Sequence, residues 1–206
     1  MPGHPGPAFG RPECRPVPDI HVFRIRHIMK GVAGEATQFP SGWSRAAAAG
    51  LTFRPITDAD LPFLARLYAS TRMEELAVTD WSDAQKIAFL QSQFNAQHAH
   101  YQKHYAGSDF FVIEQAGTAV GRLYLARWKS EHRIVDIALL PGHRRGGLGT
   151  ALLSDLLDEA ARAGKAVSIH VEKFNPAMSL YRRLGFVAAG EEGAYDLMRW
   201  VPRSGS

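Results

Sequence analysis

The chain has 206 residues, of which 46% are hydrophobic, and a formal net charge of +4 at pH 7. That length and composition suit one domain of ordinary size with a buried core. Residues 1–50 carry six Lys or Arg and three acidic residues, so they supply +3 of the charge and leave the remainder nearly neutral. With no block of like charge and no nucleic-acid motif, this distribution argues against a nucleic-acid partner.

The cysteine content and the hydrophobic pattern indicate a reducing compartment and no membrane. Cys14 is the single cysteine, which excludes an internal disulfide. No apolar run reaches the roughly 18 residues that a membrane span needs, and no cationic leader precedes an apolar run. We therefore expect a cytoplasmic protein without a membrane partner.

The first fifty residues have the composition of an extension. Seven of the twelve prolines lie there, and six of these precede Asp19. Such a segment is expected to be extended and mobile, although the alternation in Ile20–Met29 predicts one short strand or helix. The predicted organisation is a flexible extension over residues 1–50 and a domain over residues 51–206.

The first half of the domain reads as a strand, two helices and a hairpin. Leu51–Ile56 predicts a strand, and Thr57 caps a helix whose apolar residues recur at helical spacing. A loop is expected over Ser70–Trp81. A Ser82-x-x-Gln85 capping box then begins a long helix that runs toward Tyr105. The segments Phe110–Gln115 and Ala119–Trp128 predict a hairpin around Gly117.

The second half alternates strands and helices. A strand at Ile134–Leu140 precedes an amphipathic helix at Leu148–Ala163, with Gly164 as its C-cap. The expected elements after it are a strand at Ala166–Lys173, a helix at Asn175–Leu184, and strands at Phe186–Ala189 and Tyr195–Val201. This order predicts an α/β (α+β) domain with a mixed, mostly antiparallel central sheet flanked by helices.

A glycine-rich turn, Arg144-x-x-Gly147-x-Gly149, joins the strand at Ile134–Leu140 to the helix that follows it. Glycines allow close backbone approach and positive φ angles. The first amides of a helix have no internal partner and lie at the positive end of the helix dipole, which suits phosphate oxygens. An ordinary tight turn would leave the same pattern.

A second motif, N-P-A-M-S-L-Y-R-R-L-G-F, occupies Asn175–Phe186. Asn at the N-cap and Pro at the first position begin a helix without any ligand. Tyr181 shares a helical stripe with Ala177, Leu180 and Leu184, so spacing alone would make it a core aromatic residue.

Together the two motifs resemble the GNAT superfamily of N-acetyltransferases, in the usual order and spacing of that family. The resemblance covers roughly residues 51–201. It implies a sheet that splays between two parallel strands, here Ile134–Leu140 and Ala166–Lys173, with CoA in the gap. It also implies acetyl-CoA as co-substrate and no metal.

The resemblance assigns residues to the cofactor. Amides around the glycine turn would hold the pyrophosphate, with Arg144 and Arg145 as further charged contacts. Backbone groups of Ile137, Ala138 and Leu139 would bind pantetheine and polarise the acetyl carbonyl, and Asn175 would add a side-chain contact. The turn residues concerned are Arg145, Gly146, Gly147, Leu148, Gly149 and Thr150.

The resemblance makes Tyr181 the acid that protonates the leaving thiolate, since a phenol pKa of about 10 exceeds the roughly 8.5 of a thiol. The base is open between His170, Asp136 and a chain of water molecules. Acceptors in this fold usually bind near the positions of Glu74, Glu75, Trp81, Tyr124, Trp128, Glu191 and Glu192.

The leading function is therefore transfer of an acetyl group from acetyl-CoA to an amine by direct attack, the acceptor being a small molecule or a peptide. A homodimer is compatible with this function. The alternative is a non-catalytic acyl-CoA-binding or regulatory module on the same fold, which would bind CoA without turning it over. Tyr181 favours the enzyme, because a module that only binds has no use for an acid.

Overall fold

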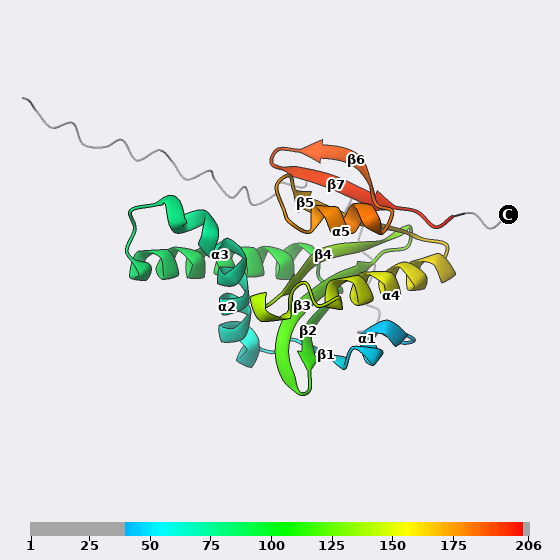
Figure 1. Ribbon diagram of the computed structural model, residues 1–206, viewed down its shortest axis with the longest axis horizontal. Coiled ribbons are helices and arrows are strands. Elements are labelled where there is room, and N and C mark those ends of the chain that lie inside the picture. Colours follow the sequence, from blue (N-terminus) through cyan, green and yellow to red (C-terminus); the bar gives the residue numbers. More distant parts are fainter. Residues whose placement is uncertain (1–39, 204–206) are drawn as a thin grey trace, which may run out of the picture. The chain divides into compact units, whose positions relative to one another are not determined.

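The computed structural model describes residues 40–203, and Figure 1 labels the helices and strands. The predicted element at Ile20–Met29 and Cys14 lie outside the described residues. The α-helices are α1 (Ser44–Ala48), α2 (Leu61–Arg72), α3 (Asp83–His104), α4 (Leu148–Arg162) and α5 (Met178–Arg183), and the short 3-10 helices are η1 (Asp58–Asp60), η2 (Met73–Val78) and η3 (Pro141–His143).

Seven strands form one sheet in the order β1-β2-β3-β4-β5-β7-β6. The pairing is antiparallel except between β4 and β5, which are parallel. This confirms the predicted mixed, mostly antiparallel sheet flanked by helices. The strands are β1 (Leu51–Pro55), β2 (Asp109–Gln115), β3 (Thr118–Arg127), β4 (Glu131–Leu139), β5 (Ala166–Glu172), β6 (Val187–Glu192) and β7 (Tyr195–Trp200).

Local capping signals explain where the first helices begin. The Ser82 hydroxyl accepts from the Gln85 amide while the Gln85 side chain accepts from the Ser82 amide, so the predicted capping box begins α3. Thr57 and Asp60 make the same reciprocal contact before α2. The loop expected over Ser70–Trp81 is wrong in part, because α2 continues to Arg72 and η2 follows it.

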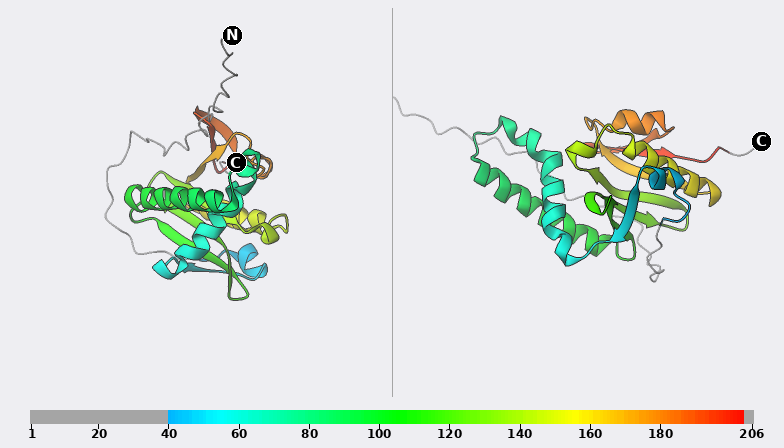
Figure 2. Two further views of the ribbon diagram at one scale, coloured as in Figure 1. Left: turned by 90° about the vertical axis from the view of Figure 1, so that its left-hand side faces the viewer. Right: turned by 60° about the horizontal axis from the view of Figure 1, so that its bottom comes forward.

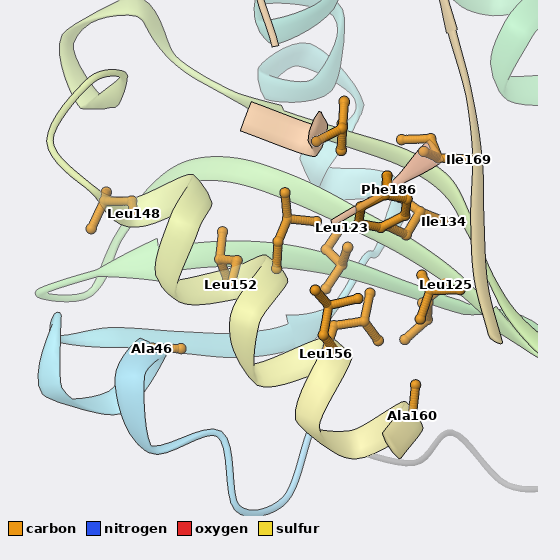
Figure 3. Close-up of a cluster of buried hydrophobic side chains, with 14 of the residues drawn as sticks. Ala46, Leu123, Leu125, Ile134, Leu148, Leu152, Leu156, Ala160, Ile169 and Phe186 are labelled. Atoms are coloured by element: carbon orange, nitrogen blue, oxygen red, sulfur yellow. The ribbon is translucent and has the colours of Figure 1, made fainter. Parts of the chain in front are cut away.

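The main core lies between one face of the sheet and α1, α4 and α5. Leu152, Leu156 and Ala160 of α4 point toward the sheet residues Leu123 and Ile134 (Figure 3). These side chains sit at helical spacing on α4 and at alternate positions on the strands, as their hydrophobic pattern predicts. The core therefore fixes α4 over the strands that carry the candidate site.

Helix α1 belongs to this core, which corrects the expectation that everything before residue 51 is an extension. Ala46 has no exposed surface, and the buried Trp43 donates its indole N–H to Glu159 of α4 at 2.7 Å. The Ala46 amide donates to Asp155 of α4 at 2.8 Å. A short Ala-rich segment carries too weak a periodic signal to reveal such packing from sequence. The extension stays a prediction for residues 1–39.

Helices α2 and α3 pack against each other and form a second hydrophobic cluster (Figures 1 and 2). Side chains of α3 contact Arg122 and Asp136, which alternate with the core-facing residues of β3 and β4, so α3 lies on the sheet face opposite α4. Within residues 40–203, no helix is long and apolar enough to cross a membrane.

Candidate active site

The two parallel strands separate halfway along their length. Their ladder begins at Glu131 opposite Ala166 and ends at Ile134 opposite Ile169, although both strands continue beyond this pair. On the other side of β4, Tyr124 pairs with Asp136 and Leu125 with Ile134, so Val135 is an extra, bulged residue. A bulge bends its strand and increases its twist. The bulge at Val135 therefore turns β4 away from β5 where their pairing stops.

The glycine-rich turn lies at the end of the separated part of β4 and leads into α4. Gly147 is the N-cap of α4 with a φ of +85°, a conformation that favours glycine. The first backbone bond of the helix is donated by the Ala151 amide to the Gly147 carbonyl. A Cβ at Gly146 or Gly147 would meet no heavy atom within 4 Å. The turn thus presents helix N-terminal amides beside open space, which suits an anion.

The two arginines of the turn differ in what they contact. Arg144 donates through Nε to the Leu139 carbonyl at 2.7 Å and through Nη2 to the Ser70 hydroxyl at 3.2 Å. Its guanidinium thus joins the turn to the end of α2. Arg145 is exposed and has a φ of +62°. Leu148 is buried in the core, whereas Thr150 is exposed at the first turn of α4.

Ile137, Ala138 and Leu139 form the last residues of β4, beyond its ladder with β5. All three are half-buried, and on their other side they pair with residues 121–123 of β3. Only one edge of this segment is therefore held by the sheet. The edge facing β5 has backbone groups that a ligand can use.

Asn175 has the local role that its sequence suggested, at a slightly different place. Its side-chain oxygen accepts from the Ala177 amide at 2.8 Å, so it closes a turn before α5. The helix itself begins at Met178, three residues later than predicted. A contact between Asn175 and pantetheine stays a prediction.

Tyr181 lies in α5, is 4% exposed, and packs edge-to-face on Phe186 with ring centroids 5.5 Å apart. Its ring belongs to the main core, as helical spacing predicts. Burial, with a smaller contribution from the charge of Asp136, raises the pKa of the phenol well above its usual value. Tyr181 therefore keeps its proton at neutral pH.

His170 is held by Arg133 of the neighbouring strand. The Arg133 side chain contacts Nδ1 of His170 and donates to the Ser168 hydroxyl at 3.1 Å. A guanidinium only donates, so Nδ1 is the acceptor and the ring proton lies on Nε2. Burial and the charge of Arg133 lower the pKa of His170 to about 4. With its lone pair engaged, His170 is a poor base.

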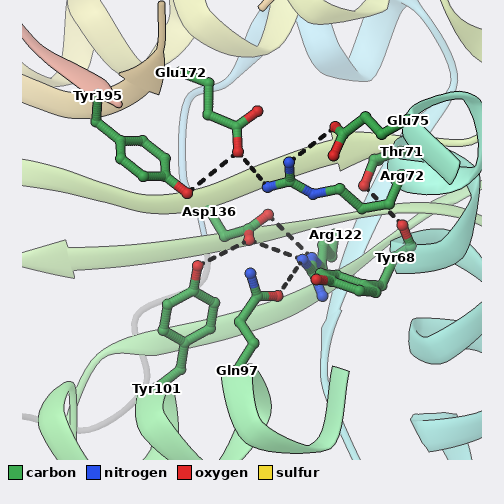
Figure 4. A network of polar contacts seen from close by, with 10 residues as sticks. All are labelled: Tyr68, Thr71, Arg72, Glu75, Gln97, Tyr101, Arg122, Asp136, Glu172 and Tyr195. Atoms are coloured by element: carbon green, nitrogen blue, oxygen red, sulfur yellow. Dashed lines mark hydrogen bonds and ion pairs between the residues drawn. The ribbon is translucent and has the colours of Figure 1, made fainter. Parts of the chain in front are cut away.

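Asp136 is held from two elements on the α3 face of the sheet (Figure 4). Arg122 donates to both of its carboxylate oxygens, at 3.0 and 2.8 Å, and the Tyr101 hydroxyl lies 3.2 Å from Oδ2. Gln97 of α3 accepts from Arg122 at 3.0 Å. Arg122 is 3% exposed, so this is a buried, charge-assisted pair. Both oxygens of Asp136 are already bound, which makes it a weak candidate for a base.

A second polar group joins α2 to β5, and sequence reasoning did not find it (Figure 4). The Arg72 guanidinium binds two carboxylates. Its Nη2 lies 2.5 Å from Oε1 of Glu172, and its Nη1 lies 2.9 Å from Oε1 of Glu75. Glu172 also accepts from the Tyr195 hydroxyl at 3.2 Å. The i,i+3 spacing of Arg72 and Glu75 was a visible signal, but the partner on β5 is a hundred residues away. The group lies at the open end of β5.

The residues expected near an acceptor do not form one wall. Tyr124 is fully buried beneath the α3 face, with its ring against Phe110. Trp128 stacks on Tyr105 with ring centroids 6.3 Å apart. Glu191 pairs with Lys173. Of this set, Glu75 is the residue that joins the polar group around Glu172.

Comparison with known proteins identifies the protein family to which a chain with this site belongs. The model of the acetyltransferase (GNAT) family matches residues 71–186, which include the separated strands, the glycine turn and Tyr181. The chain belongs to the GNAT family. This GNAT chain also shares the fold of the PaiA N-acetyltransferase from Thermoplasma acidophilum, solved in complex with coenzyme A, with a TM-score of 0.56 at 15% identity over 73% of this chain and 98% of that one.

Two bacterial relatives of this GNAT chain are similar in sequence over a shorter stretch. The L-amino acid N-acyltransferase MnaT of Escherichia coli is 34% identical over 93 residues, 42% of this chain and 54% of the relative. The L-methionine sulfoximine/L-methionine sulfone acetyltransferase of Salmonella typhimurium is 34% identical over 95 residues, 41% and 54% of the two chains. The GNAT chain thus spans about half the length of these curated relatives.

Proposed function

We propose that this protein is an N-acetyltransferase that moves the acetyl group of acetyl-CoA to a primary amine by direct attack. The observation that carries the proposal is the end of the β4–β5 ladder at Ile134 and Ile169, with the glycine turn at the end of β4. Family membership supports it, because the matched relatives are named as acyl- or acetyltransferases.

The cofactor is assigned to backbone groups that other parts of the described sheet or helix do not bind. The amides of residues 145–150 are proposed to bind the pyrophosphate, where Gly146 and Gly147 leave room for it. The free edge of Ile137–Leu139 is proposed to bind the pantetheine arm and the acetyl carbonyl, with Asn175 beside it. Arg144 is proposed to act mainly as a brace, since its guanidinium is bound to Leu139 and Ser70.

The thioester of acetyl-CoA supplies an activated acetyl group, and the chain supplies position and protons. Amide donors on β4 would stabilise the charge that develops on the carbonyl oxygen. Tyr181, which stays protonated because burial raises its pKa, would give its proton to the departing sulfur. We propose water, rather than His170 or Asp136, as the acceptor of the ammonium proton, since both side chains have their acceptor atoms engaged.

The acceptor is proposed to be a small-molecule or peptide amine that approaches from the α3 face. Glu75 and Glu172 share the single cation Arg72 there, so this group keeps one net negative charge that favours an ammonium. The names of the two relatives make amino acids and their analogues the first acceptors to try.

Two measurements test the proposal in steps. Acetyl-CoA should raise the melting temperature through selective binding to the folded state, and pantetheine, which lacks the pyrophosphate, should do much less. Equal stabilisation by both would remove the glycine turn from the cofactor site. Release of CoA thiol across a panel of amines then identifies the acceptor, and thermal stabilisation without any thiol release would leave only a binding protein.

A further inference from the structure

Strand β3 holds the separated end of β4 through three consecutive residues, Val120, Gly121 and Arg122. Ile113 pairs with Gly121 and Glu114 with Ala119, so Val120 is bulged out of the ladder with β2. Its carbonyl accepts the Leu140 amide at 2.8 Å. This bond continues the β3–β4 pairing one residue beyond Gly121 and Leu139, just before the glycine turn.

Gly121 allows β4 to come unusually close. A Cβ at this position would stand 2.5 Å from the Ala138 carbonyl oxygen and 2.7 Å from Cδ2 of Leu139. A leucine methyl can move aside, whereas the carbonyl of a paired strand moves only with its backbone. Gly146, Gly147 and Gly142 have no heavy atom within 4 Å of such a Cβ. The glycine at 121 is therefore required by the backbone of β4 itself.

The neighbouring residue fixes the same stretch from the opposite face. Arg122 is buried and holds both carboxylate oxygens of Asp136, directly after the bulge at Val135. Gly121 lies on the face of β3 that carries the core residue Leu123, while Arg122 lies on the face toward α3. The end of β4 is thus held by β3 on both faces of the sheet, in the part of β4 that lies beyond its ladder with β5.

We propose that Gly121 is a positioning residue for catalysis: it sets the place of the Ile137–Leu139 backbone and thereby the polarisation of the acetyl carbonyl. The inference rests on the proposed function, which puts the acetyl carbonyl against this segment. A side chain at position 121 pushes Ala138 and Leu139 toward the gap. None of the three atoms nearest to a Cβ at position 121 belongs to the glycine turn, residues 145–150.

The test uses acetyl-CoA labelled with a heavy isotope at its thioester carbonyl carbon, so that no acceptor is needed. Isotope-edited infrared spectra give the carbonyl stretch of the bound cofactor, which hydrogen bonds from the enzyme shift to lower frequency than in solution. In Gly121→Ala this shift should fall by about half or more, because a donor displaced by about 1 Å loses most of its effect. Because the same backbone is proposed to bind the pantetheine arm, the spectra are recorded at saturating acetyl-CoA and the affinity is measured beside them.

Matched variants separate positioning from general disruption. Gly190 lies on the edge strand β6, and a Cβ there would stand 3.9 Å from Cβ of Leu197, an ordinary contact. Gly190→Ala should therefore change neither the carbonyl shift nor the affinity for coenzyme A. Gly121→Ala/Leu139→Ala removes the crowded methyl and keeps the clash with the Ala138 carbonyl, so it should still lose the shift.

Different results would contradict the proposed function and the role of Gly121. A wild-type protein that binds acetyl-CoA without any carbonyl shift contradicts the proposed role of β4, and with it this inference. A wild-type shift that survives in folded Gly121→Ala, or that the double variant restores, overturns the role of Gly121 alone. Once an acceptor is known, kcat of Gly121→Ala saturated with acetyl-CoA should fall about tenfold or more.

Discussion

Arg133, one residue before the last ladder pair on β4, contacts Nδ1 of His170, one residue after that pair on β5, so the imidazole lone pair faces a guanidinium. Burial and, to a smaller extent, the charge of Arg133 lower the pKa of His170 to about 4. His170 was a sequence-based candidate for the base. Its contact with Arg133 joins β5 to β4 where the two strands part.

The His170→Gln variant should therefore keep kcat/KM within a few-fold of wild type. A base is active in its neutral form, so a catalytic His170 would lose activity as pH falls through its pKa of about 4. The measurement is kcat/KM against pH for wild type and variant. A loss of about a hundredfold or more in a folded variant would return His170 to the mechanism.

Gly146→Val tests the glycine turn more cleanly than a change at Gly147, whose φ of +85° would strain any side chain. Gly146 has open space around its missing Cβ, so the folded protein should tolerate the valine. Acetyl-CoA affinity should weaken at least about tenfold, which is about 1.4 kcal/mol. Isothermal titration calorimetry gives the affinity, with Gly142→Val as the matched control because its surroundings are equally open.

Tyr181→Phe keeps the edge-to-face contact with Phe186 and removes only the hydroxyl. If the phenol protonates the thiolate, kcat should fall by roughly 10²–10⁴ while acetyl-CoA affinity stays near wild type. The measurement is steady-state turnover with the acceptor found by the panel. An unchanged kcat, with chemistry shown to limit the rate, would make Tyr181 a core aromatic residue only.

Trp43→Ala should destabilise the domain, because the buried indole packs on Phe53 and donates to Glu159 of α4. Large-to-small changes at buried aromatic positions cost about 3–5 kcal/mol. Urea unfolding followed by circular dichroism measures the loss. A chain beginning at residue 40 should match the stability of the full chain, and one beginning at residue 50 should resemble Trp43→Ala or be worse. Equal stability of all four proteins would show that α1 is dispensable.

Sequence reasoning reached those parts of the fold that local chemistry determines. The Ser82–Gln85 capping box and the glycine turn before α4 are readable because each is decided by residues a few positions apart. The Arg72–Glu172 pair and the close approach of Gly121 to Ala138 are decided by strand register, which joins distant segments. Strand alternation puts His170 on the same face as Ser168 and Glu172, but its partner Arg133 comes from another strand.

The candidate site shows the same difference between features that local sequence decides and features that tertiary packing decides. Tyr181 lies in the short helix α5 and packs in the core as its spacing predicted, whereas Asn175 closes the turn before this helix. Tyr124 was expected near the acceptor but lies fully buried, with its ring against Tyr101 of α3. A residue's exposure depends on which helix covers its sheet face, and no local pattern reveals that.

The most direct test of the central claim is the joint measurement of free CoA thiol and acetylated amine in one reaction of acetyl-CoA with each amine of a panel led by amino acids. The account predicts an amine for which both products appear in equal amounts, with the rate lowered by Gly146→Val at limiting acetyl-CoA and by Tyr181→Phe at saturation. A wild-type protein that is stabilised by acetyl-CoA, yet forms no acetylated amine and releases no thiol beyond spontaneous hydrolysis, would contradict it.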